Sequence, residues 1–88
     1  MTSVTITFDD GSTHTIQLSD QAKDTIRYAF NPSALPAVHT LKALSGAFIT
    51  EIEAQKSQKP NASWQFGKAI EHATSASMWA VLAATKSV

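Results

Sequence analysis

One segment of seven residues, Arg27 to Ser33, gathers most of the groups that could bind a small ligand. It has the sequence Arg-Tyr-Ala-Phe-Asn-Pro-Ser, and we name it the corner because it is predicted to end one helix and precede another. Aromatic rings and guanidinium planes stack on nucleobases, and arginine binds phosphate. The same residues also suit a structural role, because aromatic side chains are usually buried and Asn-Pro-Ser stops and restarts helices. Chemistry alone leaves both interpretations open.

Lysines on the two later helices could add positive charge to the corner. Arg27, Lys42 and Lys68 are the cations that the predicted helices could bring around an anion. Lys42 is expected on the side of its helix opposite Val38 and Leu41. Each cation would be an ordinary solvated charge unless the three converge in space.

Residue types suited to catalysis or metal binding do not occur at a recognised spacing. His14, His39 and His72 are far apart, and none forms a pair with metal-ligand spacing. The chain has no cysteine and no glycine-rich phosphate loop. A catalytic site needs a base, a nucleophile and a charge stabiliser held together, and no such set is found. We therefore expect a binding protein that is not an enzyme and uses no cofactor or metal.

Length and charge narrow the choice of partners. The 88 residues include seven basic and seven acidic side chains, which balance to zero net charge. This balance argues against a protein that grips a long stretch of DNA or RNA. The N-terminus lacks the pattern of a signal peptide, and no apolar run approaches the roughly 18 residues of a membrane span. We expect one domain, residues 1–88, in the cytoplasm and without a membrane partner.

Residues 1–19 carry the pattern of a β-hairpin. Apolar residues alternate with polar ones at Val4, Ile6, Phe8, Ile16 and Leu18. Asp10-Gly11 predicts a tight primed turn between two strands. A two-stranded ribbon is not stable alone in water, so its apolar face must dock on the helices or on another chain.

A short helix is predicted next, over residues 20–30. Ser19 is expected to cap it, and Asn31-Pro32 would end it because proline disfavours helical geometry in the preceding residue. Ser33 is expected to cap the following helix, with Pro36 tolerated in its first turn.

A long antiparallel helical hairpin over residues 34–86 completes the predicted fold. Its first helix ends near residues 55–57, and its last helix runs from Ser63 to Lys86. Gly46 marks a weak point in the first helix or a close approach of another backbone. The last helix is rich in alanine and apolar on too many sides for a monomer, so we expect other subunits to cover it. The fold class is mainly α, with an N-terminal β-hairpin, a short helix and a helical hairpin that oligomerises.

The corner and the last helix together resemble a known family. Arg-Tyr-Ala-Phe-Asn-Pro-Ser at residues 27–33, Leu-Lys-Ala-Leu at 41–44 and Ala-Ser-Met-Trp-Ala-Val at 76–81 are similar to the helical-hairpin domain of phage anti-CBASS and anti-Thoeris sponge proteins. The likeness covers about residues 26–86. Members of that family are not enzymes. They form oligomers, commonly hexamers, that hold cyclic nucleotide immune signals in pockets between protomers and so deprive the bacterial effector of its activator.

The resemblance implies a binding site centred on the corner. Tyr28 or Phe30 would stack on a base, while Arg27 and Lys42 would bind phosphate. Further hydrogen bonds would come from Asn31, Ser33 and Thr74.

The last helix departs from the family pattern near its start. Related proteins often carry an arginine there, whereas this chain has Ser63-Trp64 and offers Lys68 a turn later. That departure leaves open both a second ligand site and the identity of the ligand.

The resemblance also implies a partner and a location. The ligand would be a cyclic di- or trinucleotide or a cyclic ADP-ribose isomer, bound by a homo-oligomer, expected to be a hexamer, in the cytosol of the host bacterium. The alternative is a small phage structural or adaptor protein whose helical hairpin packs against a partner protein. The corner and its cations favour the first function, and zero net charge with an alanine-rich helix favours the second.

Overall fold

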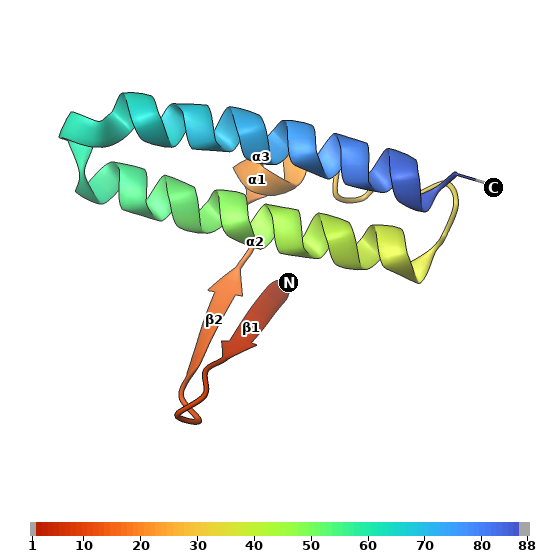
Figure 1. The fold of residues 1–88 in the computed structure, drawn as a ribbon, viewed down its shortest axis with the longest axis horizontal. Helices are drawn as coiled ribbons and strands as arrows, with labels where there is room; N and C mark the ends of the chain where they lie inside the picture. The colour runs from red at the N-terminus through yellow and green to blue at the C-terminus, as the bar shows by residue number, and fades with distance from the viewer. Residues whose placement is uncertain (1, 87–88) are drawn as a thin grey trace.

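The computed structural model describes residues 2–86 and is mainly helical (Figure 1). Its elements are β1 (Ser3–Thr7), β2 (Thr13–Gln17), α1 (Asp20–Thr25), α2 (Pro36–Gln58), the 3-10 helix η1 (Pro60–Ala62) and α3 (Ser63–Ala84). The helices α2 and α3 lie side by side and antiparallel, and the β-hairpin projects away from α2. The predicted fold class, mainly α with an N-terminal β-hairpin, a short helix and a helical hairpin, is confirmed, and its oligomerisation stays a prediction. The predicted single domain also included residues 1, 87 and 88, which lie outside the described residues.

The hairpin turn differs from the predicted primed turn. Phe8 N–H donates to the carbonyl of Ser12 at 2.8 Å, and Gly11 N–H donates to the carbonyl of Phe8 at 2.9 Å. Gly11 has a φ of 86°, and the other residues of the loop do not have positive φ. A primed turn of type I′ needs positive φ at two residues, so the prediction is wrong and the strands are joined by a three-residue loop that ends in glycine.

Only the base of the hairpin is packed against the helices. Ile16 and Leu18 are buried with Ala47 of α2, whereas Ile6 and Phe8 near the turn are exposed. The predicted docking of the apolar face is therefore confirmed for the end of the hairpin that adjoins α1.

Ser19 caps α1, as predicted. Its Oγ accepts a hydrogen bond from Ala22 N–H at 3.0 Å and donates to Glu53 Oε1 at 2.9 Å. Its own N–H donates to Thr50 Oγ1 at 3.0 Å. The cap thus ties the start of α1 to α2 as well as satisfying the helix end.

The short helix ends at Thr25 rather than at residue 30, and Asn31-Pro32 is not what ends it. Tyr28 N–H donates to the carbonyl of Lys23 at 2.8 Å, and Arg27 N–H donates to the carbonyl of Asp24 at 3.1 Å. These are the two bonds of a Schellman motif, which needs a left-handed residue after the helix. Arg27 supplies that conformation with a φ of 54°.

The cap of α2 is also different from the prediction. Leu35 occupies the cap position and makes no side-chain capping bond, while Pro36 is the first helical residue as expected. Ser33 Oγ instead donates to Asn31 Oδ1 at 2.8 Å and accepts from Leu35 N–H at 3.4 Å. Ser33 therefore stabilises the turn before the helix and does not cap it.

The core forms where α1 crosses the helical hairpin. Its buried residues there are Ala22, Ile26, Ile49 and Ala73, drawn from all three helices. A Cβ at Gly46 would clash with Leu18 and lie 3.1 Å from Ile26 Cδ1. Gly46 thus marks a close approach, but of side chains and not of the backbone expected from the sequence. None of the helices in residues 2–86 is long and apolar enough to cross a membrane.

Candidate functional site

Lys42 holds the corner in place from α2. Its Nζ donates hydrogen bonds to the carbonyl of Arg27, at 2.7 Å, and to the carbonyl of Phe30. Lys42 is only 5% exposed. The expectation that it lies opposite Val38 is wrong, because residues four apart share one face of a helix and Val38 is buried on that face too.

Burial changes the proton affinity of Lys42. Desolvation lowers the pKa of its ammonium, and the positive charge of Arg27 lowers it further. Two of the three N–H groups of the ammonium are used by backbone carbonyls, which leaves one donor for another partner.

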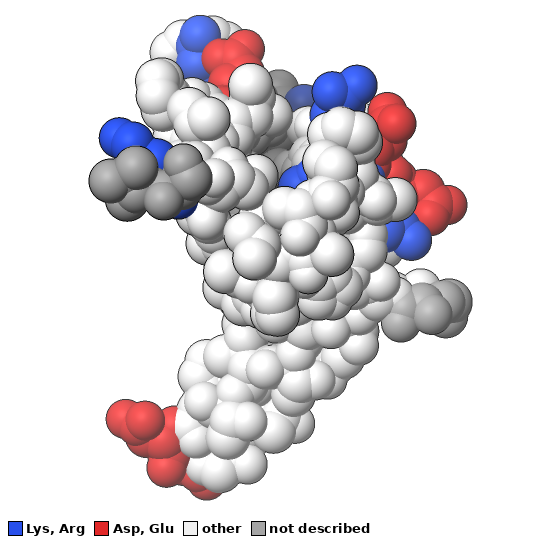
Figure 2. Space-filling model, turned by 90° about the vertical axis from the view of Figure 1, so that its right-hand side faces the viewer, with Lys and Arg blue, Asp and Glu red and all other residues white. Residues whose placement is uncertain are grey.

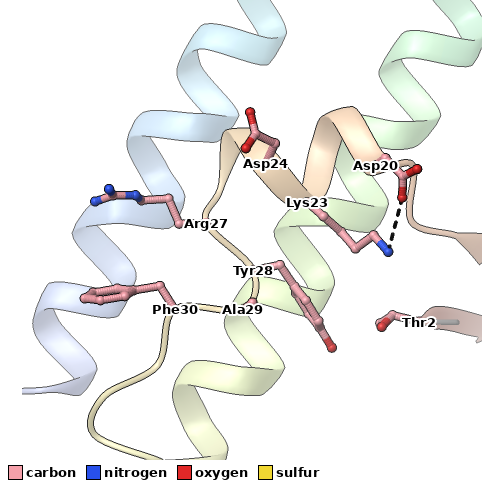
Figure 3. Close-up of a pocket in the computed structure, with 8 residues that line it drawn as sticks. All are labelled: Thr2, Asp20, Lys23, Asp24, Arg27, Tyr28, Ala29 and Phe30. Carbon is pink, nitrogen blue, oxygen red and sulfur yellow. Dashed lines mark ion pairs between the residues drawn. The ribbon is translucent and has the colours of Figure 1, made fainter.

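The ring of Phe30 lies near two positive charges. Arg27 Cζ is 5.5 Å from the ring centroid and Lys42 Nζ is 5.7 Å from it, both within cation–π range. Phe30 is 60% exposed, so part of its surface is open to a ligand. Figure 3 shows the side chains of Arg27 and Phe30 pointing to the same side of the corner.

A shallow cavity of about 560 Å³ runs along the corner and α1 (Figure 3). Arg27, Tyr28 and Phe30 line it, together with Asp20, Lys23 and Asp24 of α1. Asp20 forms an ion pair with Lys23 at 3.5 Å, whereas the described residues give Arg27 no ion-pair partner. The guanidinium of Arg27 therefore remains available to an anion.

Tyr28 does not share the position of Phe30. It is half-buried and packs against both hydrophobic clusters of the core. Its ring lies 5.6 Å from that of His39, with 3.4 Å between Tyr28 Oη and His39 Nε2. Of the two aromatic candidates, Phe30 has the open ring, and Tyr28 anchors the corner to the core.

The polar side-chain atoms of Asn31 and Ser33 form hydrogen bonds within the turn that precedes α2. Asn31 Nδ2 donates to the carbonyl of Leu35 at 3.3 Å, and its Oδ1 accepts from Ser33. Both residues line a second cavity of about 320 Å³, which they share with Phe30 and Lys42. A ligand there would meet side chains that are already oriented.

The structure does not bring Lys68 and Thr74 into the site at the corner. Lys68 forms an ion pair with Glu71 at 3.3 Å and lies 5.9 Å from the ring centroid of Trp64. Thr74 Oγ1 donates to the carbonyl of Ile70 at 2.8 Å. Because α3 runs antiparallel to α2, the C-terminal half of α3 lies beside the corner. Lys68 is in the N-terminal half of α3, toward the other end of the helical hairpin.

Ser77 of α3 was not among the site residues expected from the sequence. It is 5% exposed and lines a third cavity, of about 300 Å³, together with Arg27 and Lys42. The signal in the sequence was a serine at a core position of a helix. Such a serine attracts attention because buried hydroxyls are expected to have hydrogen-bond partners.

Figure 2 shows positive and negative side chains around the helical part of the molecule, while most of the projecting hairpin is uncharged. Acidic groups gather at the projecting hairpin tip, where the loop carries Asp9 and Asp10. Hydrogen bonds from Ser12 lower the pKa of Asp10. In the described part of the chain, no three His, Asp or Glu side chains lie close enough together to hold a metal ion.

Comparisons with protein-family models, with curated proteins and with solved structures found no match to this chain.

Proposed function

We propose that the protein binds a cyclic nucleotide at the corner and sequesters it without chemical change. The observation that carries the proposal is the open ring of Phe30 flanked by the two cations Arg27 and Lys42. A base can stack on the exposed part of the ring, at a distance from Arg27 that suits the attached phosphate.

The conformation of Arg27 adds support. Its positive φ is unfavourable for a residue with a Cβ, and glycine would satisfy the Schellman motif with less strain. An arginine at this position is more readily understood if its guanidinium binds something. Arg27 binds the phosphate directly. Lys42 is fixed by backbone carbonyls, so it positions the corner and offers its remaining N–H to the ligand.

Self-association is the second part of the proposal. Leu44 and Phe48 on α2, and Trp79 and Leu82 on α3, are more than half exposed. Soluble monomers seldom leave so many large apolar side chains in water, which favours contact with further copies of the chain. The hexamer implied by the family resemblance belongs to this proposal, and so does the host cytosol as its location.

The same apolar side chains are the specific observation for the alternative function. An adaptor would use Trp79, Leu82 and their neighbours to pack against a different protein. An adaptor would not need a cation beside an open aromatic ring, so the corner is the part of the molecule that distinguishes the two functions.

Calorimetry and thermal-shift assays with cyclic dinucleotides, a cyclic trinucleotide and cyclic ADP-ribose isomers test the proposal. A ligand at a hundred times its Kd should stabilise the protein by roughly 2.7 kcal/mol. Phe30→Ala should weaken binding by roughly 1–3 kcal/mol, the range for base stacking on an aromatic ring. Trp64→Ala is the matched control, because it removes another exposed ring that lies near a lysine but outside the corner.

A second matched pair tests the charge. Arg27→Gly and Ala34→Gly each relieve a positive φ, but only the first removes a guanidinium. Arg27→Gly should lose binding and Ala34→Gly should retain it. Nucleotide recovered after denaturation should be chemically intact by liquid chromatography. Equal binding by Phe30→Ala, Arg27→Gly and the unmodified protein would exclude the corner, and recovery of linearised nucleotide would indicate an enzyme.

A further inference from the structure

The corner covers the second cavity, which separates it from the helical hairpin. Residues 30–33 form one wall of this cavity, and the other wall is formed by Val38 and Lys42 of α2 with Val81 and Thr85 at the end of α3. Figure 1 shows the connection from α1 to α2 passing beside the C-terminal end of α3. No side chain of residues 27–34 is buried, so a hollow and few apolar contacts lie between the corner and the helices.

Left-handed backbone conformations occur at both ends of this segment. Arg27, which begins the corner, has a φ of 54°, and Ala34, which directly follows the corner, has a φ of 55°. They are the only residues other than glycine in residues 2–86 that have a positive φ. This region is unfavourable for any residue with a Cβ, and such a conformation persists only where the surrounding structure holds it.

Two contacts hold the corner against the helices. Tyr28 is half-buried against the core, and Lys42 Nζ donates hydrogen bonds to the carbonyls of Arg27 and Phe30. Among residues 2–86, the bond from Lys42 to Phe30 is the one hydrogen bond that joins residues 29–34 to α2 or α3. The other hydrogen bonds of this segment stay within residues 27–35.

We propose that the corner opens as one unit about Arg27 and Ala34 while α2 and α3 stay folded, and that Lys42 holds it closed. Opening relaxes the two left-handed residues and uncovers Val38, whereas closing restores the hydrogen bonds of Lys42. Relief of strain favours the open state and loss of the hydrogen bonds opposes it, so substitutions at the two kinds of position shift the equilibrium in directions that can be stated in advance. The inference goes beyond the proposed function, because it gives the corner a way to admit a molecule to the cavity beneath it whatever that molecule is.

Thiol labelling with iodoacetamide measures the opening. The chain has no cysteine, so a single one can be placed at Val38, below the corner, or at Ile49, in the core where α1 crosses the helical hairpin. Both residues are on α2 and both are 1% exposed. Val38→Cys should react at least about tenfold faster than its own global unfolding, measured in urea, allows. Ile49→Cys should react only as fast as its global unfolding allows.

Substitutions at Lys42 and Ala34 test what controls the opening. Lys42→Met combined with Val38→Cys should speed labelling roughly fivefold or more, after correction for the global stability of the same double variant. Ala34→Gly should slow labelling roughly two- to fivefold, because glycine tolerates the positive φ. Ala34→Val should speed labelling, because a β-branched residue tolerates this φ least. The side chain of Ala34 is exposed, so neither of its changes alters the core.

Amide hydrogen exchange followed by NMR needs no cysteine. The amides of Phe30 and Ala34 are both bonded within the segment, so they should share one free energy of opening that is lower than that of the Ile49 amide. The proposed opening is wrong if Val38→Cys reacts no faster than global unfolding allows. It is also wrong if Ala34→Val leaves the exchange of the Phe30 amide unchanged. No nucleotide is present in these measurements, so either result leaves the proposed function standing.

Discussion

Two places within residues 2–86 set a cation near an aromatic ring, and they are built in different ways. At the corner, Arg27 and Lys42 flank Phe30 at 5.5 and 5.7 Å. At the far end of the helical hairpin, Lys68 lies 5.9 Å from the ring of Trp64. The distances are nearly equal, so distance alone does not distinguish a binding site from a surface contact.

The difference lies in what fixes each cation. Lys42 is held by two backbone carbonyls, and the Schellman motif fixes the backbone of Arg27. Lys68 stands four residues after Trp64 on one helix and is neutralised by Glu71. A group that is already ordered loses less conformational entropy on binding, so the corner is the place where a ligand would gain affinity.

The strongest test of this contrast is Lys42→Met against Lys68→Met. Methionine fills much of the same space but donates no hydrogen bonds, so the carbonyl of Phe30 would lose its Lys42 donor, while the carbonyl of Arg27 would keep only the N–H of Phe30. An acceptor left without a partner at a part-buried site costs roughly 1–3 kcal/mol. Lys68→Met removes only an exposed ion pair and should change the free energy of unfolding by less than about 1 kcal/mol.

Urea denaturation monitored by circular dichroism measures both changes. A Lys42→Met protein as stable as the Lys68→Met protein would mean that the ammonium does not hold the corner, and the contrast between the two ends would disappear.

Two glycines distinguish the packed and the open side of the helical hairpin. Gly46→Ala would push a Cβ into Leu18 and Ile26, and overpacking of this kind costs typically about 1–3 kcal/mol. Gly67, between Trp64 and Lys68, has nothing near the position of its Cβ. Gly67→Ala should therefore raise the free energy of unfolding by roughly 0.5–1 kcal/mol through helix propensity alone.

Thermal and urea unfolding of these two variants give the sign of each effect. Destabilisation by Gly67→Ala would show that the Trp64 end is covered in solution, for instance by another subunit. Stabilisation by Gly46→Ala would show that Leu18 can move aside at little cost.

The sequence predicted the elements better than it predicted their ends. Alternation in the hairpin and three- and four-residue steps in the helices are local patterns, and Ser19 lies where the cap was expected. The end of α1 could not be predicted in this way, because a left-handed arginine is rarer than glycine in a Schellman motif. The prediction of a primed turn was wrong for a similar reason, since Asp-Gly also fits a longer loop in which only the glycine has positive φ.

Only the part of the candidate site that lies within the corner could be predicted from the sequence. Arg27 and Phe30 lie three residues apart in one segment, so their proximity follows from the sequence. The burial of Lys42 depends on where α1 ends, and the burial of Ser77 beside Lys42 depends on which half of α3 faces the corner. Lys68 was grouped with the other cations by charge alone, and no local pattern could show that an antiparallel helix carries it to the other end.

A smaller effect is expected from the backbone of the corner. Arg27→Gly and Ala34→Gly each replace a residue of positive φ, 54° and 55°, by the residue that tolerates it. Both should raise the free energy of unfolding by roughly 0.5–1 kcal/mol, by removing an unfavourable left-handed conformation. Chemical denaturation of the pair measures it, and a loss of stability in Arg27→Gly alone would mean that the contact of the guanidinium with Phe30 outweighs the strain.

The smallest effect concerns pH and the ammonium of Lys42. Burial and the charge of Arg27 lower the pKa of Lys42 in the folded state, so between that lowered pKa and about pH 10.5, the ordinary value for lysine, the unfolded chain binds more protons than the folded one. Stability should therefore rise with pH from the folded pKa up to that value, by at most about 1.4 kcal/mol per pH unit for a single proton. Other groups titrate in the same range, so the measured quantity is the difference between the unmodified protein and Lys42→Met in urea unfolding at several pH values. Arg27→Gly should raise the pKa of Lys42 and make the rise shallower, which NMR of the lysine side chain can follow directly. A folded-state pKa for Lys42 at or above the ordinary value would show that the carbonyls of Arg27 and Phe30 stabilise the charge more than burial disfavours it.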